Sequence, residues 1–430
     1  MGAVHLHMPL LMVAAARSFE VDVLVFGALL VVGALASGIV RHSLLSLTAL
    51  FVLVGFALGD GGLGVVHFGA RSAFTGELAT IALIVILLRD GLEVEGEMLQ
   101  AHWHLPLRKL VLAMPLTAAI VAGAARLLTD FSWTECLLLG ALLSPTDPVL
   151  SSSVVTNPRV PRIVRHSLNL ESGLNDGLAL PAVLAFAAAL GPGAAHFNWW
   201  RFVAQDLGVG LVSGLVVGML AARLMPRPHE DDERPGIPSH QISLYALGAA
   251  FASYGIAVLP PHGNGLIAVF VAAITLGIRR PDARGHFERQ AENLVEIVKL
   301  GIFVVFGSLL TLHGLLGDGW GAVGIVAATL LVARPVAVFA ALSGTAIDRA
   351  TKGFMGWFGP KGVATMTFSL LVLADRIPAA SRIFNLAALV VFCSIIAHGV
   401  TDTAGSEWLA RRSERATDSP ADLGEDLAAE

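Results

Sequence analysis

Three carboxylate side chains lie in stretches that are otherwise apolar enough for the interior of a membrane. Asp147 interrupts one apolar run within Ser-Pro-Thr-Asp-Pro at 144–148, and Glu171 and Asp176 lie at the start of the next run. A charged residue at the centre of a bilayer costs about 2.5 to 3.5 kcal/mol on insertion scales, so it marks a candidate functional site. The chemistry that a carboxylate offers in such surroundings is the binding of a proton or a small cation.

Helical spacing sorts the polar residues of the second run into two sets. Ser172 and Asp176 are four residues apart and share one helix face, while Glu171 and Asn175 share the neighbouring face. Such oxygen ligands suit a hard cation, and burial disfavours the charged form of a carboxyl group. We therefore expect Asp176 to hold either a proton or a monovalent cation. The alternative is that Asp176 merely pairs with a basic residue.

The residues around Asp147 predict a broken helix. Pro145 and Pro148 lack an amide hydrogen, so an α-helix cannot hydrogen-bond through them. Unwound backbone at membrane depth is tolerated where it lines a cavity or is buried in protein. The break exposes carbonyl groups that can coordinate a cation, and the Asp147 carboxylate stands beside them. The alternative role for Asp147 is to compensate the partial positive charge at an end of its own broken helix, without contact to an ion.

A second interrupted run, Gly-Trp-Phe-Gly-Pro-Lys-Gly at 356–362, contains Lys361, which we expect to compensate a negative helix end in that run. Broken helices at corresponding positions of two halves predict an inverted-repeat transporter. Arg334, which precedes a proline in mid-run, needs a carboxylate partner because an unpaired buried guanidinium is too costly. Glu171 is the candidate for that partner.

Other polar and small residues in apolar runs have simpler interpretations. Arg89 and Asp90 end an apolar run and are expected to reach the membrane interface by snorkelling. Lys299 is three residues from Glu296, and the two are expected to pair locally. Glycines at 210, 214 and 218 repeat at helical spacing and predict a packing surface inside the protein.

The composition of the chain indicates which class of fold holds these residues in place. Of 430 residues, 55% are hydrophobic and 14% are charged, whereas soluble domains carry about 25% charged residues. With about 20 apolar residues needed to cross a bilayer, the fold class is an all-α polytopic membrane protein of about thirteen spans, of which the fifth and twelfth are broken. The spans are expected at 19–39, 44–58, 74–90, 107–128, 133–155, 166–190, 200–222, 241–258, 264–279, 292–312, 320–342, 355–374 and 383–404.

The distribution of basic residues predicts the orientation. Eighteen Lys and Arg residues, Lys109 among them, fall in the odd-numbered connections and the tail, against six on the other side. By the positive-inside rule the N-terminus is then outside and the C-terminus cytoplasmic, in the cell membrane. We expect a membrane transporter domain at 1–410 and a disordered cytoplasmic tail at 411–430, which is acidic and rich in alanine.

Four segments together resemble the cation/proton antiporter superfamily, specifically its NhaP-type sodium/proton exchanger branch. They are Thr146-Asp147-Pro148, Glu-Ser-Gly-Leu-Asn-Asp at 171–176, Arg334-Pro335, and Gly-Pro-Lys-Gly-Val-Ala at 359–364, which is similar to the Gly-Leu-Arg-Gly-Ala segment of the branch. The order and spacing of these segments fit the branch over nearly the whole chain.

The resemblance implies a homodimer, with a core of helices at roughly 107–190 and 320–404 and a dimerisation domain at roughly 19–90 and 200–312. It also assigns roles to residues. Those implied to bind the ion are Asp176, Ser172, Asp147 and Thr146, and those implied to support the site are Glu171, Asn175, Arg334 and Lys361. Two departures stand out: Lys361 replaces the usual arginine and loses its planar fork, and Arg89-Asp90-Gly91 stands where the branch tends to have a glutamate.

We interpret the chain as a secondary antiporter that exchanges Na⁺, or alternatively K⁺ or Li⁺, for H⁺. Asp176 follows an asparagine rather than a second aspartate, which predicts a single titrating carrier and electroneutral 1:1 exchange. A cation channel or uniporter is the alternative, although no selectivity-filter segment is present. No His-Glu-x-x-His motif indicates a membrane-embedded protease, so no enzyme activity is expected. No cofactor and no nucleic acid partner is expected beside the transported ions and the lipid bilayer.

The predicted orientation can be tested at the connection from Arg279 to Arg289. If this connection is cytoplasmic, a membrane-impermeant thiol reagent should not label Arg284→Cys from outside intact cells, because the bilayer bars the reagent. Permeabilised cells serve as the control and should allow labelling. Efficient labelling from outside would contradict the thirteen-span topology.

Overall fold

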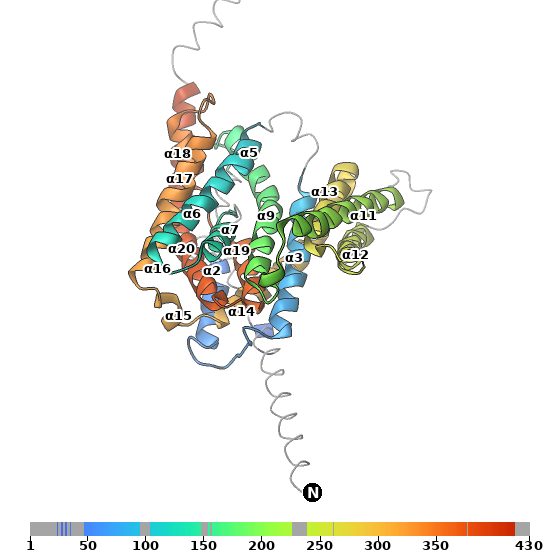
Figure 1. Ribbon diagram of the computed structural model, residues 1–430. Coiled ribbons are helices and arrows are strands. Elements are labelled where there is room, and N and C mark those ends of the chain that lie inside the picture. Colours follow the sequence, from blue (N-terminus) through green and yellow to red (C-terminus); the bar gives the residue numbers. More distant parts are fainter. Residues whose placement is uncertain are drawn as a thin grey trace, which may run out of the picture.

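A computed structural model describes residues 47–94, 104–147, 157–225, 239–260, 262–375 and 377–417, together with isolated positions at 24, 27, 28, 31, 35 and 154. Within these ranges the regular structure is helical throughout, as the ribbon drawing shows (Figure 1). The predicted all-α fold class is confirmed. The predicted first span at 19–39 lies outside the described residues, apart from the isolated positions.

The described part of the chain contains the following helices. In chain order they are α2 Leu47–Leu58, α3 Ala73–Leu92, α5 His104–Arg108, α6 Met114–Leu128, α7 Trp133–Leu142, α9 Arg162–Leu190, α10 Trp199–Arg201, α11 Gly210–Leu224, α12 Ser239–Val258, α13 Gly265–Arg279, α14 Pro281–Ser308, α15 Leu312–Leu316, α16 Trp320–Ala327, α17 Arg334–Ala341, α18 Arg349–Trp357, α19 Val363–Ala374 and α20 Ala380–Thr417. A 3₁₀ turn lies at Ala194–His196.

Six helical stretches of the described chain are long and apolar enough to cross a membrane: His104–Leu128, Arg162–Leu190, Trp199–Leu224, Gln241–Val258, Trp320–Ala341 and Ala380–Glu414. Four shorter apolar helices, at Thr48–Leu58, Trp133–Leu142, Gly265–Arg279 and Val363–Ala374, accompany them. The protein is therefore a multi-pass membrane protein. The count of thirteen spans stays a prediction.

Three of the long helices are joined from shorter pieces by π-helical segments, at Lys109–Ala113, Phe202–Val209 and Ala328–Ala333. Two of these segments end just before an X-Pro pair, Met114-Pro115 and Arg334-Pro335. A proline removes one backbone donor and its ring clashes with the carbonyl four residues earlier, so a locally widened turn accommodates it. Such bulges are frequent at functional sites.

The same order of elements occurs twice. A helix with a π segment before a proline (α5–α6) precedes the interrupted α7 and then the long α9; another such helix (α16–α17) precedes the interrupted α18–α19 and then the long α20. Helix α7 ends at Leu142, and residues 143–147 are not helical. Helices α18 and α19 are separated by residues 358–362. The remainder of the predicted fifth span, including Pro148, lies largely outside the described residues.

One predicted boundary is wrong. Helix α20 continues to Thr417, so residues 411–417 of the expected disordered tail are helical, and residues 418–430 lie outside the described part. Arg411 pairs with Glu407 one turn earlier at 2.8 Å, a spacing that supports a helix at the surface. Helix α14 begins at Pro281, upstream of the predicted span at 292–312, and Pro281 stands at the first helical position, which suits proline.

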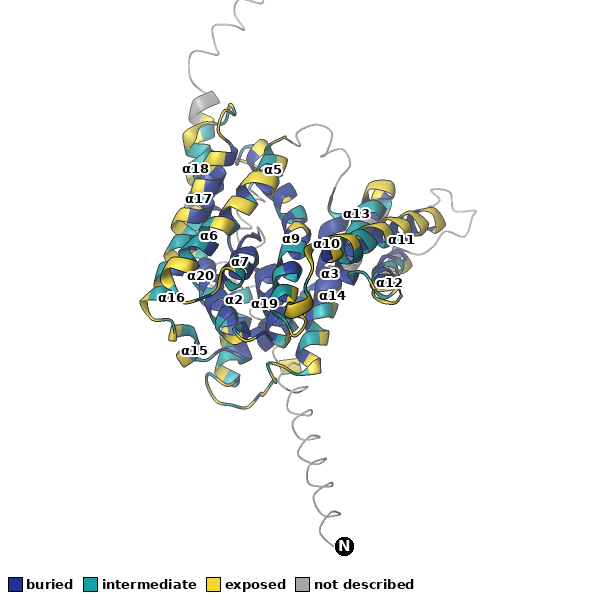
Figure 2. Cartoon of the chain, in the orientation of Figure 1, coloured by how far each residue is buried: buried dark blue, intermediate teal, exposed yellow. Residues whose placement is uncertain are grey.

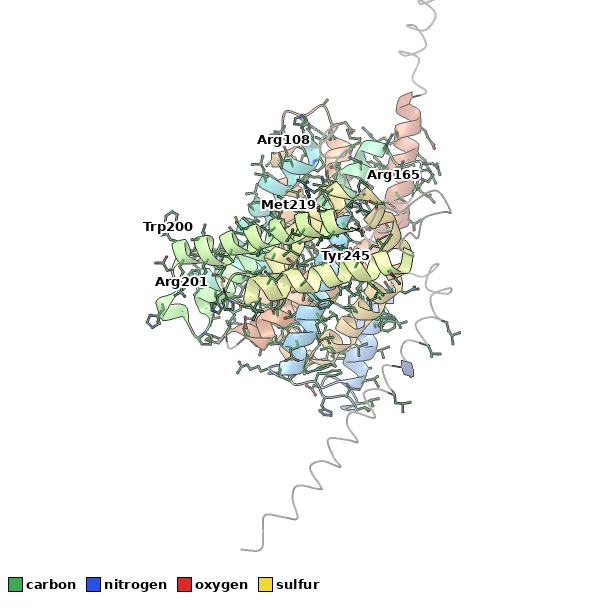
Figure 3. All side chains as sticks on the ribbon, turned by 90° about the vertical axis from the view of Figure 1, so that its right-hand side faces the viewer. Arg108, Arg165, Trp200, Arg201, Met219 and Tyr245 are labelled. Atoms are coloured by element: carbon green, nitrogen blue, oxygen red, sulfur yellow. The ribbon has the colours of Figure 1, made fainter. Side chains whose placement is uncertain are left out.

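Helices α11, α12 and α13 pack together at one side of the molecule (Figure 1). A side view looks onto α11 and α12, where Met219 and Tyr245 are labelled (Figure 3). The glycine repeat of α11 meets α13: a Cβ atom at Gly214 would lie 2.4 Å from the Ala268 carbonyl oxygen, and one at Gly218 would lie 2.7 Å from that of Ala272. The predicted packing surface is thus confirmed as internal.

Helix α3 runs through the interior and contacts α9, α13, α14 and α19. Its residues 82–88 are all buried, and Figure 2 shows the buried positions concentrated at the centre of the molecule. This burial places the C-terminal end of α3, where Arg89 and Asp90 lie, inside the protein.

Candidate cation and proton site

The two helix interruptions meet in space. The Asp147 amide donates to the Pro360 carbonyl oxygen at 2.8 Å, and the Val363 amide donates to Asp147 Oδ2 at 3.3 Å. A third bond runs from Thr365 Oγ1 to the Leu142 carbonyl oxygen at 3.0 Å. Backbone N–H and C=O groups that lose their helical partners at one interruption thus form hydrogen bonds with the other. Buried backbone groups require such partners.

Charge compensation at these helix ends is crosswise. The ammonium of Lys361 donates to the Ser144 and Pro145 carbonyl oxygens at 3.3 and 3.1 Å, just beyond the C-terminal end of α7. Asp147 in turn accepts from the first residue of α19. Each side chain therefore compensates the partial charge of the other interrupted helix. Our expectation that each would act within its own helix is wrong, because it treated the two interruptions as separate in space.

Glycines at 359 and 362 make this close approach possible. A Cβ atom at Gly362 would lie 2.4 Å from Asp147 Oδ2, and one at Gly359 would lie 1.9 Å from Arg334 Nε. Real Cβ atoms do not approach other atoms this closely. The glycines of the Gly-Pro-Lys-Gly segment are therefore required by contact with charged side chains.

Glu171 of α9 lies between two buried cations. The Arg334 guanidinium donates to it at 2.7 and 3.3 Å, which confirms the predicted pair. The Lys109 ammonium donates to Glu171 Oε2 at 2.6 Å and to the Ser167 carbonyl oxygen at 3.0 Å. Lys109 opens one π segment and Arg334 directly follows another. Both cations thus come from the corresponding irregular helices of the two halves.

Lys109 was missed by the sequence reasoning, which placed it with Arg108 in a cytoplasmic connection. In the structure Lys109 is fully buried, whereas Arg108 donates to the Ser343 carbonyl oxygen at the surface. Only the helical phase separates these neighbours. Pro115 marks an irregular helix, but it lies six residues after Lys109, whereas Pro335 directly follows Arg334, so the sequence carried no direct signal for Lys109.

Asn175 connects α9 to the interruption after α7. Its Nδ2 donates to the carbonyl oxygen of Thr146 at 2.6 Å and to Thr146 Oγ1 at 3.0 Å. This bond agrees with a supporting role for Asn175. Because it engages both oxygens of Thr146, it also fixes the predicted ligand Thr146 in place.

Asp176 and Asp90 face each other in the interior. They are 8% and 2% exposed, and their charges act on each other. Asp176 Oδ1 and Asp90 Oδ2 are buried and have no hydrogen-bond partner within the described structure. Leaving a buried acceptor unsatisfied is costly, so the pair is suited to a bound proton or cation. Ser172, one turn before Asp176, is half-buried.

Arg89 and Asp90 do not snorkel to the interface, so that expectation is wrong. The Arg89 guanidinium donates to Asp90 Oδ1 at 2.6 and 2.9 Å, and its side chain is mostly buried. The sequence reasoning took the charged end of this span to reach the membrane interface. Burial by α9, α13, α14 and α19 decides otherwise.

The carboxylates of Asp90, Asp147 and Asp176 act electrostatically on one another, and Arg89 acts on all three of them. Lys299 of α14 is buried and acts on Asp90 and Asp147, while its pair with Glu296 is long, at 3.8 Å. Among these buried groups three acids face two bases, and the partly exposed Glu93 and Glu296 lie 3.7 and 3.8 Å from the same two bases. Among the described residues, no three His, Cys, Asp or Glu side chains close on one point as a metal centre would.

Comparison with known proteins gives consistent results. A family model described as "Sodium/hydrogen exchanger, transmembrane" matches residues 26–404. The chain is 26% identical over 366 residues to the K(+)/H(+) antiporter NhaP2 of Shewanella sp. (strain MR-4), covering 83% of this chain and 61% of that protein. It is 24% identical to the K(+)/H(+) antiporter NhaP of Alkalimonas amylolytica, covering 91% and 67%. The chain thus spans about three fifths of the length of the first relative.

Among solved structures, the sodium proton antiporter MjNhaP1 from Methanocaldococcus jannaschii at pH 8 is similar to this chain. The TM-score is 0.78 and the sequence identity is 20%, with 91% of this chain and 99% of that chain covered. At this identity the likeness concerns the fold.

The arrangement around Glu171 predicts that removing the Glu171 charge destabilises the protein more than removing the Lys109 charge. Glu171→Gln should lower the melting temperature in detergent more than Lys109→Met does, because it leaves two buried cations facing each other, whereas removing a cation leaves one ion pair. Breaking a buried pair typically costs about 3 to 5 kcal/mol. Adding Lys109→Met to Glu171→Gln should therefore restore part of the loss. Equal effects of the single changes, without rescue, would contradict this account.

Proposed function

The chain belongs to the sodium/hydrogen exchanger family, and from that premise we propose that it exchanges a monovalent cation for a proton across the membrane. The observation that carries the proposal is the buried pair of Asp176 and Asp90, each with one oxygen that lacks a partner. Such a pair needs a positive charge between or beside its members. A proton and an alkali cation both supply one.

Competition for Asp176 is sufficient for coupling. When Asp176 holds a proton it cannot serve as an anionic ligand, and when it holds a cation it releases the proton. Hard oxygen ligands such as carboxylate and hydroxyl groups suit Na⁺, K⁺ and Li⁺. We propose Na⁺ as the main substrate; the named relatives include K⁺/H⁺ antiporters and a probable Na⁺/H⁺ antiporter.

The charge of the site supports electroneutral exchange. Counting the buried groups and leaving out the partly solvent-exposed Glu93 and Glu296, Asp90, Asp147 and Asp176 contribute three negative charges, and Arg89 and Lys299 contribute two positive charges. One monovalent cation or one proton then neutralises the cluster, so the loaded site carries the same charge with either substrate. Exchange should be 1:1. Glu171 stays outside this count because Lys109 and Arg334 already compensate it.

The supporting residues hold the geometry. Asn175 fixes Thr146, and Lys361 and Asp147 hold the two interruptions together. We propose that α5–α9 and α16–α20 form a core that moves against α2–α3 and α10–α14, which give the scaffold and the surface for a homodimer in the cell membrane, with the C-terminus cytoplasmic. Since Asp176 lies on the core and Asp90 on the scaffold, such motion would alter their separation, as alternating access requires.

A channel or uniporter is the second candidate, but it would not require coupling to protons. Asp176→Asn should abolish cation-driven proton movement in proteoliposomes, because the amide keeps the shape of the side chain but cannot exchange a proton. The matched control Asp60→Asn, at an exposed position, should exchange normally. For the wild type, an imposed membrane potential should leave the rate unchanged. Residual exchange in Asp176→Asn, or a strong response to the potential, would contradict the model.

Lys299 provides an independent test of the charge count. Replacing it by glutamine should lower the apparent KM for the cation by about tenfold, since the site becomes more negative. A tenfold change corresponds to about 1.4 kcal/mol, a modest Coulomb energy inside a protein. Lys299→Arg keeps the charge and should leave KM nearly unchanged. An unchanged KM in Lys299→Gln would show that Lys299 does not act on the site.

A further inference from the structure

The guanidinium of Arg89 on α3 lies between two carboxylates that differ in burial. It donates to Asp90 Oδ1 from Nε at 2.9 Å and from a terminal nitrogen at 2.6 Å, and its Nε lies 3.7 Å from Glu93 Oε1. The Asp90 side chain is 3% exposed, whereas the Glu93 side chain is 42% exposed. Arg89 is therefore at the boundary between the buried carboxylate cluster and the end of α3, with an acid on each side.

Helical geometry alone would pair Arg89 with Glu93. Residues four apart in an α-helix lie on the same face, whereas adjacent residues point about 100° apart. Glu93 is four residues after Arg89, and Asp90 is the next residue. Arg89 nonetheless forms its hydrogen bonds with Asp90. The burial of Asp90 accounts for this choice, because an interior carboxylate without a compensating cation is costly, whereas water can solvate Glu93.

The backbone at this end of α3 is held by α13. A Cβ atom at Gly91 would lie 2.6 Å from the Cβ atom of Ala273, and one at Gly277 would lie 2.9 Å from the Leu92 carbonyl oxygen. Such close packing leaves the helix end little room to turn. A change of partner by Arg89 is therefore a change of side-chain rotamer, without movement of α3.

The oxygens that Arg89 leaves open distinguish a proton from a metal cation. Both of its hydrogen bonds end on Asp90 Oδ1, so Asp90 Oδ2 and Asp176 Oδ1 have no hydrogen-bond partner within the described structure. A proton binds to one oxygen atom and can use either of these while Arg89 stays in place. A hard metal cation draws on several oxygen ligands at once, and a guanidinium on the same carboxylate repels it.

We propose that Arg89 is a tethered counter-ion that a metal cation, but not a proton, displaces from Asp90 to Glu93. The inference rests on the proposed function of the site. Before a cation binds, Arg89 compensates Asp90; when the cation binds, the guanidinium turns to Glu93 and Asp90 becomes a ligand. Glu93 is then a positioning residue that raises the affinity for the cation relative to that for the proton.

The short movement preserves the charge count of the site. From its present position Arg89 already acts on Asp90, Glu93 and Asp147. A turn of its side chain toward Glu93 changes its hydrogen bonds but keeps its charge beside the cluster. The exchange of one cation for one proton therefore remains electroneutral.

The fixed charges of the site cannot produce the same discrimination. Within the described chain, the charged side chains that act on Arg89 from neighbouring elements are Asp147, Asp176 of α9 and Lys299 of α14. Their fields act alike on a proton and on a monovalent cation, because each carries one positive charge. An effect on the cation alone therefore identifies displacement of Arg89, and an equal effect on both substrates identifies the field alone.

Glu93→Gln tests the proposal because it removes the charge that receives Arg89. The apparent KM for Na⁺ is measured in proteoliposomes over a range of pH. Its limiting value at high pH reports the cation affinity, and the pH at which it begins to rise reports the proton affinity. In Glu93→Gln the limiting KM should rise about threefold to fivefold, the range of a partly exposed ion pair, while the pH of the rise stays unchanged.

Two further variants serve as controls. Glu93→Asp keeps the charge and should retain a KM close to that of the wild type. Glu296→Gln removes a partly exposed acid that lies 3.8 Å from Lys299, so it alters only the field, and any shift should be equal for the cation and the proton. An unchanged limiting KM in Glu93→Gln, or an equal loss of proton affinity there, would overturn the proposal.

A double change shows whether Glu93 acts through Arg89. In an Arg89→Gln background, Glu93→Gln should leave the limiting KM unchanged, because no guanidinium remains to be received; the same rise as in the wild-type background would contradict the proposal. Binding can also be followed without transport, since a bound cation raises the melting temperature in detergent. Even if no exchange is detected, Glu93→Gln should need more Na⁺ than the wild type for the same rise. A wild type whose melting temperature does not respond to Na⁺ would overturn the inference.

Discussion

The structure depends on the contact between two interrupted helices inside a membrane protein. Each interruption releases backbone donors and acceptors that lipid cannot satisfy, and each presents a helix end with a partial charge. Asp147 and Lys361 compensate these ends crosswise, and backbone bonds close the remainder. Neither interruption would be stable without the other. Because they are joined, a change at one is transmitted to the other, and the carboxylates beside them are held in a fixed frame.

Around that frame the charges form two groups with different chemical capacities. Glu171 has two cations within hydrogen-bond distance and carries no unpaired negative charge, which suits a structural role. Asp90 and Asp176 have buried oxygens without partners, which suits a role in which a positive charge enters and leaves. Separating the groups lets the protein keep several buried charges in a low-dielectric interior while leaving one site responsive to protons and cations.

Glycines and π-helical segments make room for the charged side chains around the two interruptions. Glycines at 359 and 362 leave room for Arg334 and Asp147, and π-helical segments adjust two helices at the positions that deliver Lys109 and Arg334. The imidazole of His398 on α20 contacts the Trp357 carbonyl oxygen at the end of α18. Local irregularity in this fold thus coincides with charged side chains, because a regular helix has neither the free backbone groups nor the space to accommodate them.

The sequence by itself determined the class of the protein, most helix positions and the pairing of Glu171 with Arg334. Apolar length, proline positions and the cost of a buried charge are local or pairwise properties that a sequence displays. Tertiary structure alone decided that Lys109 is a second partner of Glu171, that Asp90 faces Asp176, and that Lys361 serves the other broken helix. These facts depend on helical phase and on which helices enclose α3. A shift of one residue turns a side chain by about 100°, so no count of charges along the chain could have settled them.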